Sequence, residues 1–532
     1  MKFKRIILFN IILLTFISLL PARHITAAAP LAAPGGNVST SDDFIAALGG
    51  DEAAYAEDNI IILKSDITLL NPVVITHGEY VMQGSGCYTY RGSDSEALFI
   101  IDGGAALTLG NDKGSDDHPS LSIFGNGYKG GAVRVKNGAL KIYQGTLFEE
   151  LEADFGCAVY IDSGNVIMYA GAVKNCHALK GGGAVYMSGG NFTAYLGDFT
   201  ECTSGGNGGM LYMDGGSFIG GLLNINHNSA EKGGAVYVFD GEYVMNNGSI
   251  EYNKAEDGGA ICNINGNVYI KGGYLIYNEA LNHGGAIYNA GNLYISNVNT
   301  TTIMYNTAKN GAAISNNGYF VLTDASISYN TASECAGGIY NTGIADMLGA
   351  SVSMNESNGR CGGVMNTGKF SMSDGSISSN KSASTAKGME NWGTLILSDH
   401  CFISFNNDVI IGNGAKVEVT SMLTANTPVA TFTPVKSKNG YEDPAPVADY
   451  EIGRQIITGE PDILAMAAEK LAVTNTDNGT WRIDENGKLQ FEKKSYELPI
   501  RFIIIFGALG CIVIAIAVSV ISIIIRRSKK AK

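Results

Sequence analysis

The chain has 532 residues, a formal net charge of −14, and 69 Gly against 11 Pro, with 16% of its residues charged and 45% apolar. Disordered chains combine low hydrophobicity with high charge, so this composition excludes intrinsic disorder. The glycines do not recur at every third residue, which excludes collagen, and the acidic balance excludes a basic nucleic-acid-binding protein.

The N-terminal segment predicts a secretory signal peptide. Lys2, Lys4 and Arg5 precede an apolar run at 6–20, and small residues follow at 27–29. A basic start, a short apolar stretch and small residues are the three parts of such a peptide. The alternative is an uncleaved N-terminal anchor, although the run is short for a membrane span.

The beginning of the mature chain predicts a cap for the fold. Residues 41–43 are polar and precede the apolar segment 44–48, which is typical of a short N-capped helix. Strands are expected at 60–64 and 73–76, where β-branched residues gather.

A block of small residues followed by an aliphatic residue recurs every 25 to 27 residues. Gly182-Gly183-Ala184-Val185 is a clear copy. The aliphatic residues of the successive copies are Val133, Val159, Val185, Leu211, Val236, Ile261, Ile287, Ile314, Ile339, Val364 and Met389. A longer interval before Val133 holds an inserted loop at 112–119. Such constant spacing indicates a repeat architecture.

Two asparagine columns share this period. The first column comprises Asn263, Asn289, Asn316, Asn341, Asn366 and Asn391. The second comprises Asn253, Asn278, Asn306, Asn330, Asn355, Asn380 and Asn406. An apolar residue stands three before each member of the second column, and Tyr or another residue stands one before it, as Ile250 and Tyr252 do before Asn253. Positions two apart share one face of a strand, so both are expected on its apolar face.

Each repeat therefore contains about three short strands and shows no helical periodicity. A period near 25 with this content is one coil of a parallel β-helix, whereas propeller blades need ~40 residues and leucine-rich repeats need their own leucine signature. Coils stack at ~4.8 Å, so the asparagine side chains are expected to hydrogen-bond along the stack. The predicted fold is all-β, a right-handed parallel β-helix of about twelve coils, capped at both ends, plus one C-terminal transmembrane helix.

The Gly-Gly-Ala-aliphatic blocks resemble the repeats of chlamydial polymorphic outer-membrane proteins. More broadly they are similar to the right-handed parallel β-helices of the pectate-lyase-like superfamily. The resemblance covers about residues 97–410. It implies a rod-shaped surface domain, and it also implies that polysaccharide lyase or hydrolase activity has to be considered.

The C-terminal part loses the period and then becomes apolar. Strands are expected at 416–423 and 479–491 within a cap or stalk. Residues 502–525 carry no charge, which is long enough for a membrane-spanning helix, and five positive charges follow within 526–532. The positive-inside rule places this tail in the cytoplasm. The predicted localisation is the cell membrane, with a single pass and the bulk of the chain extracellular.

In chain order, the expected segments are a signal peptide at 1–29, an N-terminal cap and first coils at 30–96, β-helix repeats at 97–412, a C-terminal cap or stalk at 413–497, a transmembrane helix at 498–525 and a basic cytoplasmic tail at 526–532.

The repeats offer little catalytic chemistry. Arg134 and Arg360 are the arginines of residues 97–410 and lie nine coils apart, so they are not expected to act together. The cluster at 116–118 (Asp-Asp-His) is interpreted as a solvated loop, and His283 as structural. An enzyme would bring three carboxylates, or a carboxylate and a cation, together on one face of neighbouring coils. No catalytic residue, metal ligand or cofactor is assigned.

The residues that follow the aliphatic positions form the candidate binding site. They are Tyr160, Tyr186, Tyr212, Tyr237, Tyr288 and Tyr340, with Cys262 and Ser315 as interruptions. Each neighbours an inward-facing residue, so each is expected to point outward and the set to form an exposed stripe. Tyrosine suits sugar faces and protein contacts. The alternative is a self-stacking column that only stabilises the coils.

The cysteines leave two possibilities open. Cys176 and Cys202 are 26 residues apart, as are Cys335 and Cys361, so each pair is expected on adjacent coils. Adjacent coils lie within reach of a disulfide, and stacked free thiols are the other interpretation.

The leading hypothesis is an adhesin-like surface protein that binds a glycan or a host surface protein along its repetitive face. The expected partners are this glycan or host surface protein and the membrane. No nucleic-acid partner is expected. The alternatives are a membrane-tethered polysaccharide lyase or hydrolase and a structural surface spacer.

Overall fold

The computed structural model describes residues 31–33, 36–38, 40–50, 54–84, 87–91, 96–110, 121–383, 386–404, 407–435, 450–476 and 478–493. The expected signal peptide, the 112–119 loop, the expected transmembrane helix and the basic tail lie outside these residues. Among the described residues, no helix has both the length and the apolar character that a membrane span requires.

The short helix predicted near the N-terminus is present, and it begins with the polar residues 41–43 that were expected to precede it. Helix α2 (Ser41–Leu48) begins after Thr40, whose hydroxyl accepts from the Asp43 N–H at 3.1 Å while the Asp43 carboxylate accepts from the Thr40 N–H at 3.0 Å. This reciprocal pair is a capping box, which satisfies backbone donors that a helix start leaves free. The strands expected nearby are β4 (Ile60–Leu63) and β6 (Val73–Ile75).

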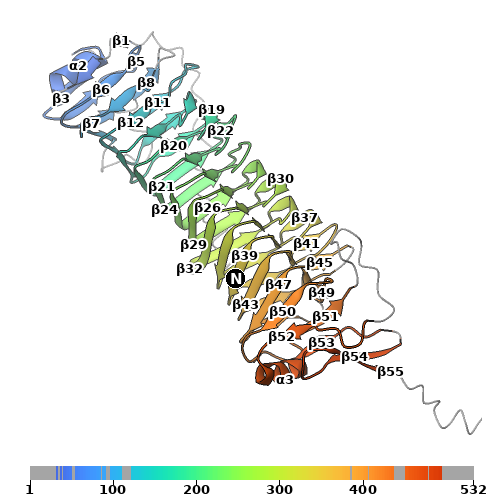
Figure 1. Cartoon of the computed structure of the whole chain (residues 1–532). Coiled ribbons are helices and arrows are strands. Elements are labelled where there is room, and N and C mark those ends of the chain that lie inside the picture. Colours follow the sequence, from blue (N-terminus) through green and yellow to red (C-terminus); the bar gives the residue numbers. More distant parts are fainter. Residues whose placement is uncertain are drawn as a thin grey trace, which may run out of the picture.

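The chain forms a straight rod, with α2 at one end and α3 (Pro461–Lys470) near the other (Figure 1). It is a parallel β-solenoid of about 14 turns. One coil passes through β25 (Val236–Val238), β26 (Glu242–Glu251) and β27 (Lys254–Asp257), which belong to three different sheets. Each strand pairs in parallel with the equivalent strand of the next coil.

We name the sheets B, A and C in the order in which each coil visits them. The central strands of sheet B are β12 (Val133–Val135), β16 (Val159–Ile161), β20 (Val185–Met187), β23 (Leu211–Met213), β25, β28 (Ile261–Asn263), β31 (Ile287–Asn289), β34 (Ile314–Asn316), β38 (Ile339–Asn341), β42 (Val364–Asn366) and β46 (Met389–Asn391). The long strands of sheet A are β21 (Asn191–Thr200), β24 (Ser217–Asn226), β26, β29 (Asn267–Ile276) and β32 (Asn292–Met304). Sheet C contains β15 (Glu152–Phe155), β19 (His177–Gly181), β22 (Thr203–Ser204), β27, β30 (Glu279–His283), β33 (Thr307–Asn310), β37 (Thr331–Cys335), β41 (Glu356–Ser357) and β45 (Lys381–Ser382).

The predicted number of about twelve coils is too low, because the stack continues where the sequence repeat has faded. Beyond residue 412, β51 (Ala430–Pro434) pairs with β49 (Val409–Ile411) and then with β53 (Leu471–Val473). Longer connections separate these strands, so the period disappears from the sequence while the parallel pairing persists. The antiparallel hairpin of β54 (Gly479–Ile483) and β55 (Leu489–Lys493) follows them.

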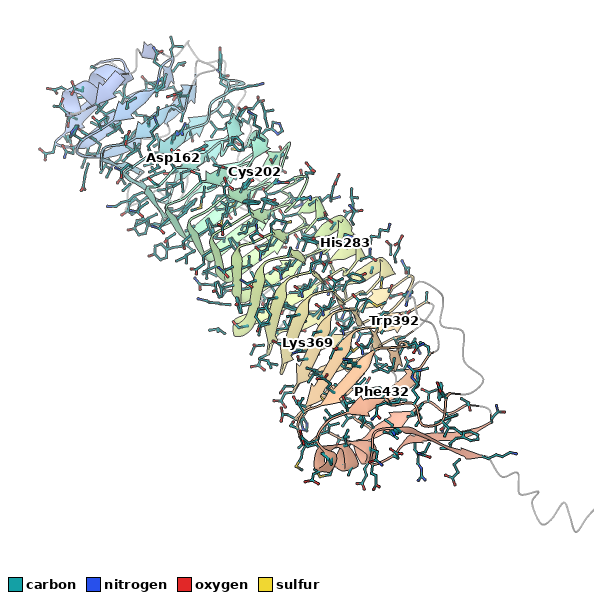
Figure 2. All side chains as sticks on the ribbon, viewed as in Figure 1. Asp162, Cys202, His283, Lys369, Trp392 and Phe432 are labelled. Atoms are coloured by element: carbon teal, nitrogen blue, oxygen red, sulfur yellow. The ribbon has the colours of Figure 1, made fainter. Side chains whose placement is uncertain are left out.

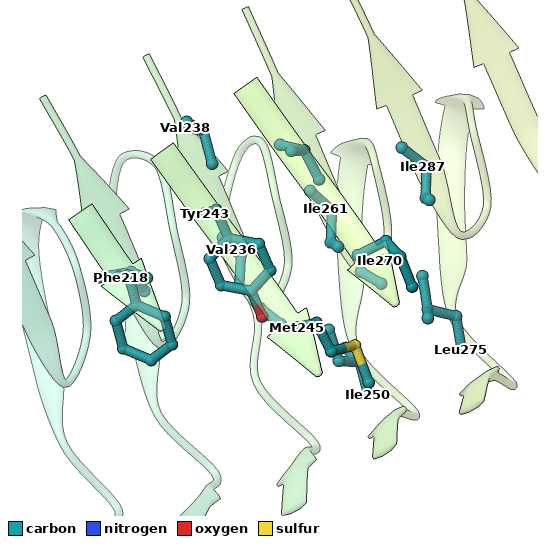
Figure 3. Close-up of a cluster of buried hydrophobic side chains, with 14 of the residues drawn as sticks. Phe218, Val236, Val238, Tyr243, Met245, Ile250, Ile261, Ile270, Leu275 and Ile287 are labelled. Carbon is teal, nitrogen blue, oxygen red and sulfur yellow. The ribbon is translucent and has the colours of Figure 1, made fainter. Parts of the chain in front are cut away.

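The core runs along the interior as columns of like side chains. Phe218 and Tyr243 stack at 5.4 Å between ring centroids (Figure 3). The register of the next coil places Val268 in the same column. Alternation over the first half of β29, with Val268 and Ile270 buried, places one face of the strand inside. Each apolar residue is thereby shielded by its equivalents in the coils above and below.

The two asparagine columns are buried and hydrogen-bonded along the stack, as predicted, with one correction. The last member of the second column is Asn407, which accepts from Asn380 at 3.0 Å, and not the predicted Asn406, which lies outside the described residues. Asn253 donates from its side-chain amide to Asn278 Oδ1 at 3.0 Å, and Asn263 donates to Asn289 Oδ1 at 2.8 Å. The second column begins one coil earlier, at Asn228. Buried amides are costly unless they are paired, and here the next coil supplies the partner.

The doubled glycines have two separate causes. Gly258 adopts a φ of +66°, a region that side chains other than Gly enter at a cost. Gly259 has no room for a side chain, since a Cβ there would collide with the carbonyl oxygen of Gly285 in the next coil. The first glycine therefore makes the corner and the second permits close stacking.

Candidate binding face

The six predicted tyrosines lie on the outer side of sheet B, between inward-facing neighbours. We call Tyr160, Tyr186, Tyr212, Tyr237, Tyr288 and Tyr340 the tyrosine column. The strand register aligns its members coil by coil, with Cys262 and Ser315 in the same column. The first four rings touch in sequence, with centroids 4.8, 5.2 and 4.9 Å apart.

The prediction that the whole column is exposed is wrong for two of its members. Tyr186 is 8% exposed and Tyr237 is 7% exposed, whereas the other four are partly exposed. The Phe155 ring at the end of β15 lies 4.7 Å from the Tyr186 ring, so sheet C covers part of the column. The planes of neighbouring rings also meet at steep angles, 73° between Tyr186 and Tyr212. Every second ring therefore lies beneath its neighbours.

Polar contacts fix the column along one edge. The Tyr186 hydroxyl donates to Asp214 Oδ2 at 3.3 Å, and burial together with the charge of Asp214 raises the pKa of Tyr186. The side-chain amide of Asn317 donates to the Tyr288 hydroxyl at 3.0 Å. These rings are therefore held in place before any ligand arrives.

The two positions of the tyrosine column that hold no tyrosine, Cys262 and Ser315, differ in their surroundings. The His283 ring lies 6.4 Å from the rings of both Tyr288 and Tyr340, across the position of Ser315. The position of Cys262 is closed to solvent, because its side chain is fully buried. This burial, and after it the charge of Asp257, raises the pKa of the Cys262 thiol to about 12. His283, interpreted from the sequence as structural, thus adds its ring to the tyrosine column.

Arg134 occupies the tyrosine column one coil before Tyr160 and is bound to a carboxylate of the next coil. Its Nε and Nη2 atoms donate to the two Asp162 oxygens, each at 2.8 Å, and its guanidinium lies 4.6 Å from the Tyr160 ring centroid. The hydrogen bonds with Asp162 raise the pKa of Arg134. Asp214 lies two coils further along the same edge. A carboxylate and a cation therefore do meet on one face of neighbouring coils, as an enzyme would require, but the two are hydrogen-bonded to each other as an ion pair.

Arg360 makes a second ion pair at the far end of the column. It contacts Glu390, which is fully buried, and the indole N–H of Trp392 also donates to Glu390, at 3.2 Å. Asp162, His283 and Trp392 follow one another along the rod in that order (Figure 2). The two arginines, predicted to be unable to cooperate, are each paired at opposite ends of the face.

A second aromatic column lies at the corner between sheets A and C. We call His227, Tyr252, Tyr277, Tyr305 and Tyr329 the corner ladder. Its rings stack face to face, with centroids 5.0 to 5.4 Å apart, and its tyrosines are 41 to 45% exposed. The prediction that Tyr252 shares the inward face with Ile250 is therefore wrong.

Backbone geometry explains this outward turn. Tyr252, Tyr277, Tyr305 and Tyr329 have φ values of 56 to 58°, the left-handed region. A residue in that conformation ends the strand and leaves its alternation, so the side chain swings outward. Tyrosine gives no signal for this region, which Asn and Asp enter most readily, as Asn175 does in an earlier coil.

The cysteines of the described coils are free thiols. Cys176 and Cys202 are both buried, and neither is in a disulfide; the same holds for Cys361 and the less buried Cys335. Within the described ranges, no three His, Cys, Asp or Glu side chains gather as a metal site would require. The cluster at 116–118 lies outside these ranges.

Comparison with known proteins adds no relative, since no family model, curated protein or solved structure matches this chain.

Proposed function

We propose that this chain is a membrane-anchored, extracellular β-solenoid that binds a glycan or a protein partner along its repetitive face, in the manner of an adhesin. The observation that carries the proposal is the tyrosine column, in which aromatic side chains occupy the outer face of sheet B in six coils. Tyrosine is enriched at binding surfaces because it offers apolar area and a hydroxyl at little cost in conformational entropy. The apolar segment 502–525 and the basic tail support the membrane anchor.

The test uses the purified full chain in detergent on glycan and protein arrays. A variant with Tyr160, Tyr212, Tyr288 and Tyr340 all replaced by Ala removes the partly exposed rings and keeps the buried Tyr186 and Tyr237. The expected result is that binding is lost while the circular dichroism spectrum is unchanged. Binding that survives the fourfold replacement would exclude the tyrosine column as the binding surface.

The Arg134–Asp162 pair favours a second candidate, a membrane-tethered polysaccharide lyase or hydrolase. Asp162 and Asp214 lie two coils apart on one edge, about 10 Å at the usual coil spacing, near the upper end of the separation found in inverting glycosidases. The full chain is incubated with plant, fungal and animal polysaccharides, and new reducing ends are measured. Release that stops in both Asp162→Asn and Asp214→Asn would support the enzyme, and absence of release would favour the adhesin-like protein.

A further inference from the structure

The open rings of the tyrosine column come in two pairs. Tyr160 and Tyr212 lie on either side of buried Tyr186, and Tyr288 and Tyr340 lie on either side of buried Ser315. The members of each pair are two coils apart, about 10 Å at ~4.8 Å per coil. Within each pair the open rings are separated by two coils, whereas three coils separate Tyr212 from Tyr288, so the column presents two separate patches of the same spacing.

Exposed polar side chains flank both pairs on the same edge. Asp214 lies beside Tyr212, and Asn317 and Thr342 lie beside Tyr288 and Tyr340. The Thr342 hydroxyl donates to Asn317 Oδ1 at 2.8 Å, so this edge is ordered. An apolar ring with hydrogen-bonding groups at its side matches a sugar, whose C–H face packs on the ring while its hydroxyls reach the polar edge.

The two-coil separation of the open rings favours a glycan over a peptide as the bound chain. In an extended β-1,4-linked glycan each sugar is turned by half a rotation relative to the last, so every second sugar presents the same face. The advance over two such sugars is close to the two-coil separation of the open rings. A peptide strand advances ~3.3 Å per residue, so its same-face side chains, ~6.6 Å apart, do not keep step with the rings.

The charges around the column select a neutral glycan. Asp162 and Asp214 raise the pKa of Tyr160, after burial, and Asp214 does the same for Tyr212, so carboxylates lie close to both rings of the first pair. Arg134, the nearest cation, is occupied by Asp162. A polyuronate or sulfated chain would be repelled by this face and by the net charge of −14.

We propose that the tyrosine column binds a neutral, extended β-1,4-linked glycan at each pair of open rings, with Tyr160 and Tyr212, and likewise Tyr288 and Tyr340, packing on alternate sugars and the polar edge binding their hydroxyls. This inference rests on the proposed function and names the class of partner.

The experiment measures binding of cello-, chito- and mannooligosaccharides of increasing length to the full chain in detergent, by isothermal titration calorimetry. Affinity is expected to rise in a step, and not evenly, when the oligosaccharide reaches about three sugars, because only then can two alternate sugars pack on both rings of one pair. Tyr212→Ala and Tyr340→Ala are each expected to weaken binding at their own pair about tenfold, as loss of one stacked sugar does, and to leave the other pair unchanged. The matched control is Tyr277→Ala, which removes an exposed tyrosine of the corner ladder and is expected to leave affinity unchanged.

Each other outcome overturns the inference in a recognisable way. Affinity that rises evenly with every sugar, or equal binding of oligogalacturonate, would contradict the two-sugar register or the neutral ligand. Tyr212→Leu keeps apolar packing without an aromatic face, so it separates loss of stacking from loss of folding. If a protein or another glycan binds through the tyrosine column, this inference fails and the proposed function stands. If no ligand depends on the column, both fail.

Discussion

Asn306 Oδ1 accepts two hydrogen bonds from Asn278 of the preceding coil, one from its side-chain amide at 3.0 Å and one from its backbone N–H at 2.9 Å. Asn306 in turn donates to the backbone carbonyl oxygens of Leu275 and Met304. One buried side chain thus ties together its own corner and that of the coil before it.

Asn306→Ala is expected to destabilise the solenoid by about 3 kcal/mol or more, because it leaves several buried donors and acceptors without partners at about 1–3 kcal/mol each. Chemical denaturation followed by circular dichroism measures the change. Asn165→Ala, in an exposed position of sheet A, is the control and is expected to change stability by less than about 0.5 kcal/mol. Equal effects of the two substitutions would contradict a structural role for the buried ladder.

Tyr277→Asn and Tyr277→Ala are expected to differ in stability, with the Asn variant the more stable of the two. Both lose two ring contacts, worth about 0.5–1.5 kcal/mol each. Asn recovers part of this because it tolerates the left-handed backbone at this corner, which costs most other residues about 1–2 kcal/mol. Thermal unfolding compares the two variants with the parent. The account of the corner would be wrong if Ala were tolerated better than Asn.

Asp198→Asn is expected to stabilise the protein near pH 7 and to have little effect near pH 3. Burial raises the pKa of Asp198, against the opposing effects of Asn224 and Lys174. A carboxyl with a raised folded pKa contributes stability below its unfolded pKa of ~3.9, and this contribution is lost as the pH rises through the folded value. Asn stays neutral at every pH and still accepts the hydrogen bond that Asn224 donates at 3.2 Å. Melting temperatures at the two pH values test this, and equal shifts at both would contradict it.

Cys176 and Cys202 are expected to react with a maleimide only after unfolding. Both thiols are buried, and burial raises the pKa of Cys176 well above its usual range, which leaves little reactive thiolate. Cys335 is less buried and is expected to be labelled first among the described cysteines. Mass spectrometry with and without denaturant gives the count of labelled sites. A missing pair of sites in the unreduced, denatured protein would reveal a disulfide.

The sequence was sufficient for those features that repeat, and insufficient for those that arise between coils. The spacing of Val185 and its equivalents predicted the parallel strands, and the columns of Asn253 and Asn263 predicted the buried ladders. The burial of Tyr186 depends on Phe155, which lies on a different strand and carries no periodic signal. The outward turn of Tyr252 depends on a backbone angle that tyrosine seldom adopts.

The sequence contains a signal for the position of Arg134. Arg134 follows Val133 as Tyr160 follows Val159, so its place in the tyrosine column was readable from the sequence. Its partner was not, since Asp162 comes from the next coil at a position that no repeat marks. The coils after 412 were missed for a similar reason, because uneven connections conceal strands that still pair in register.

The second asparagine column also has a direction. From Asn228 to Asn380 every side-chain amide donates to the asparagine of the following coil, and Asn407 accepts the last of these bonds, so each coil within the series offers an acceptor to the coil before it and a donor to the one after. A coil from the middle of this series could be duplicated or deleted, and its new neighbours would present the same partners. The length of the rod is thus free to change during evolution by whole coils, while both ends stay as they are.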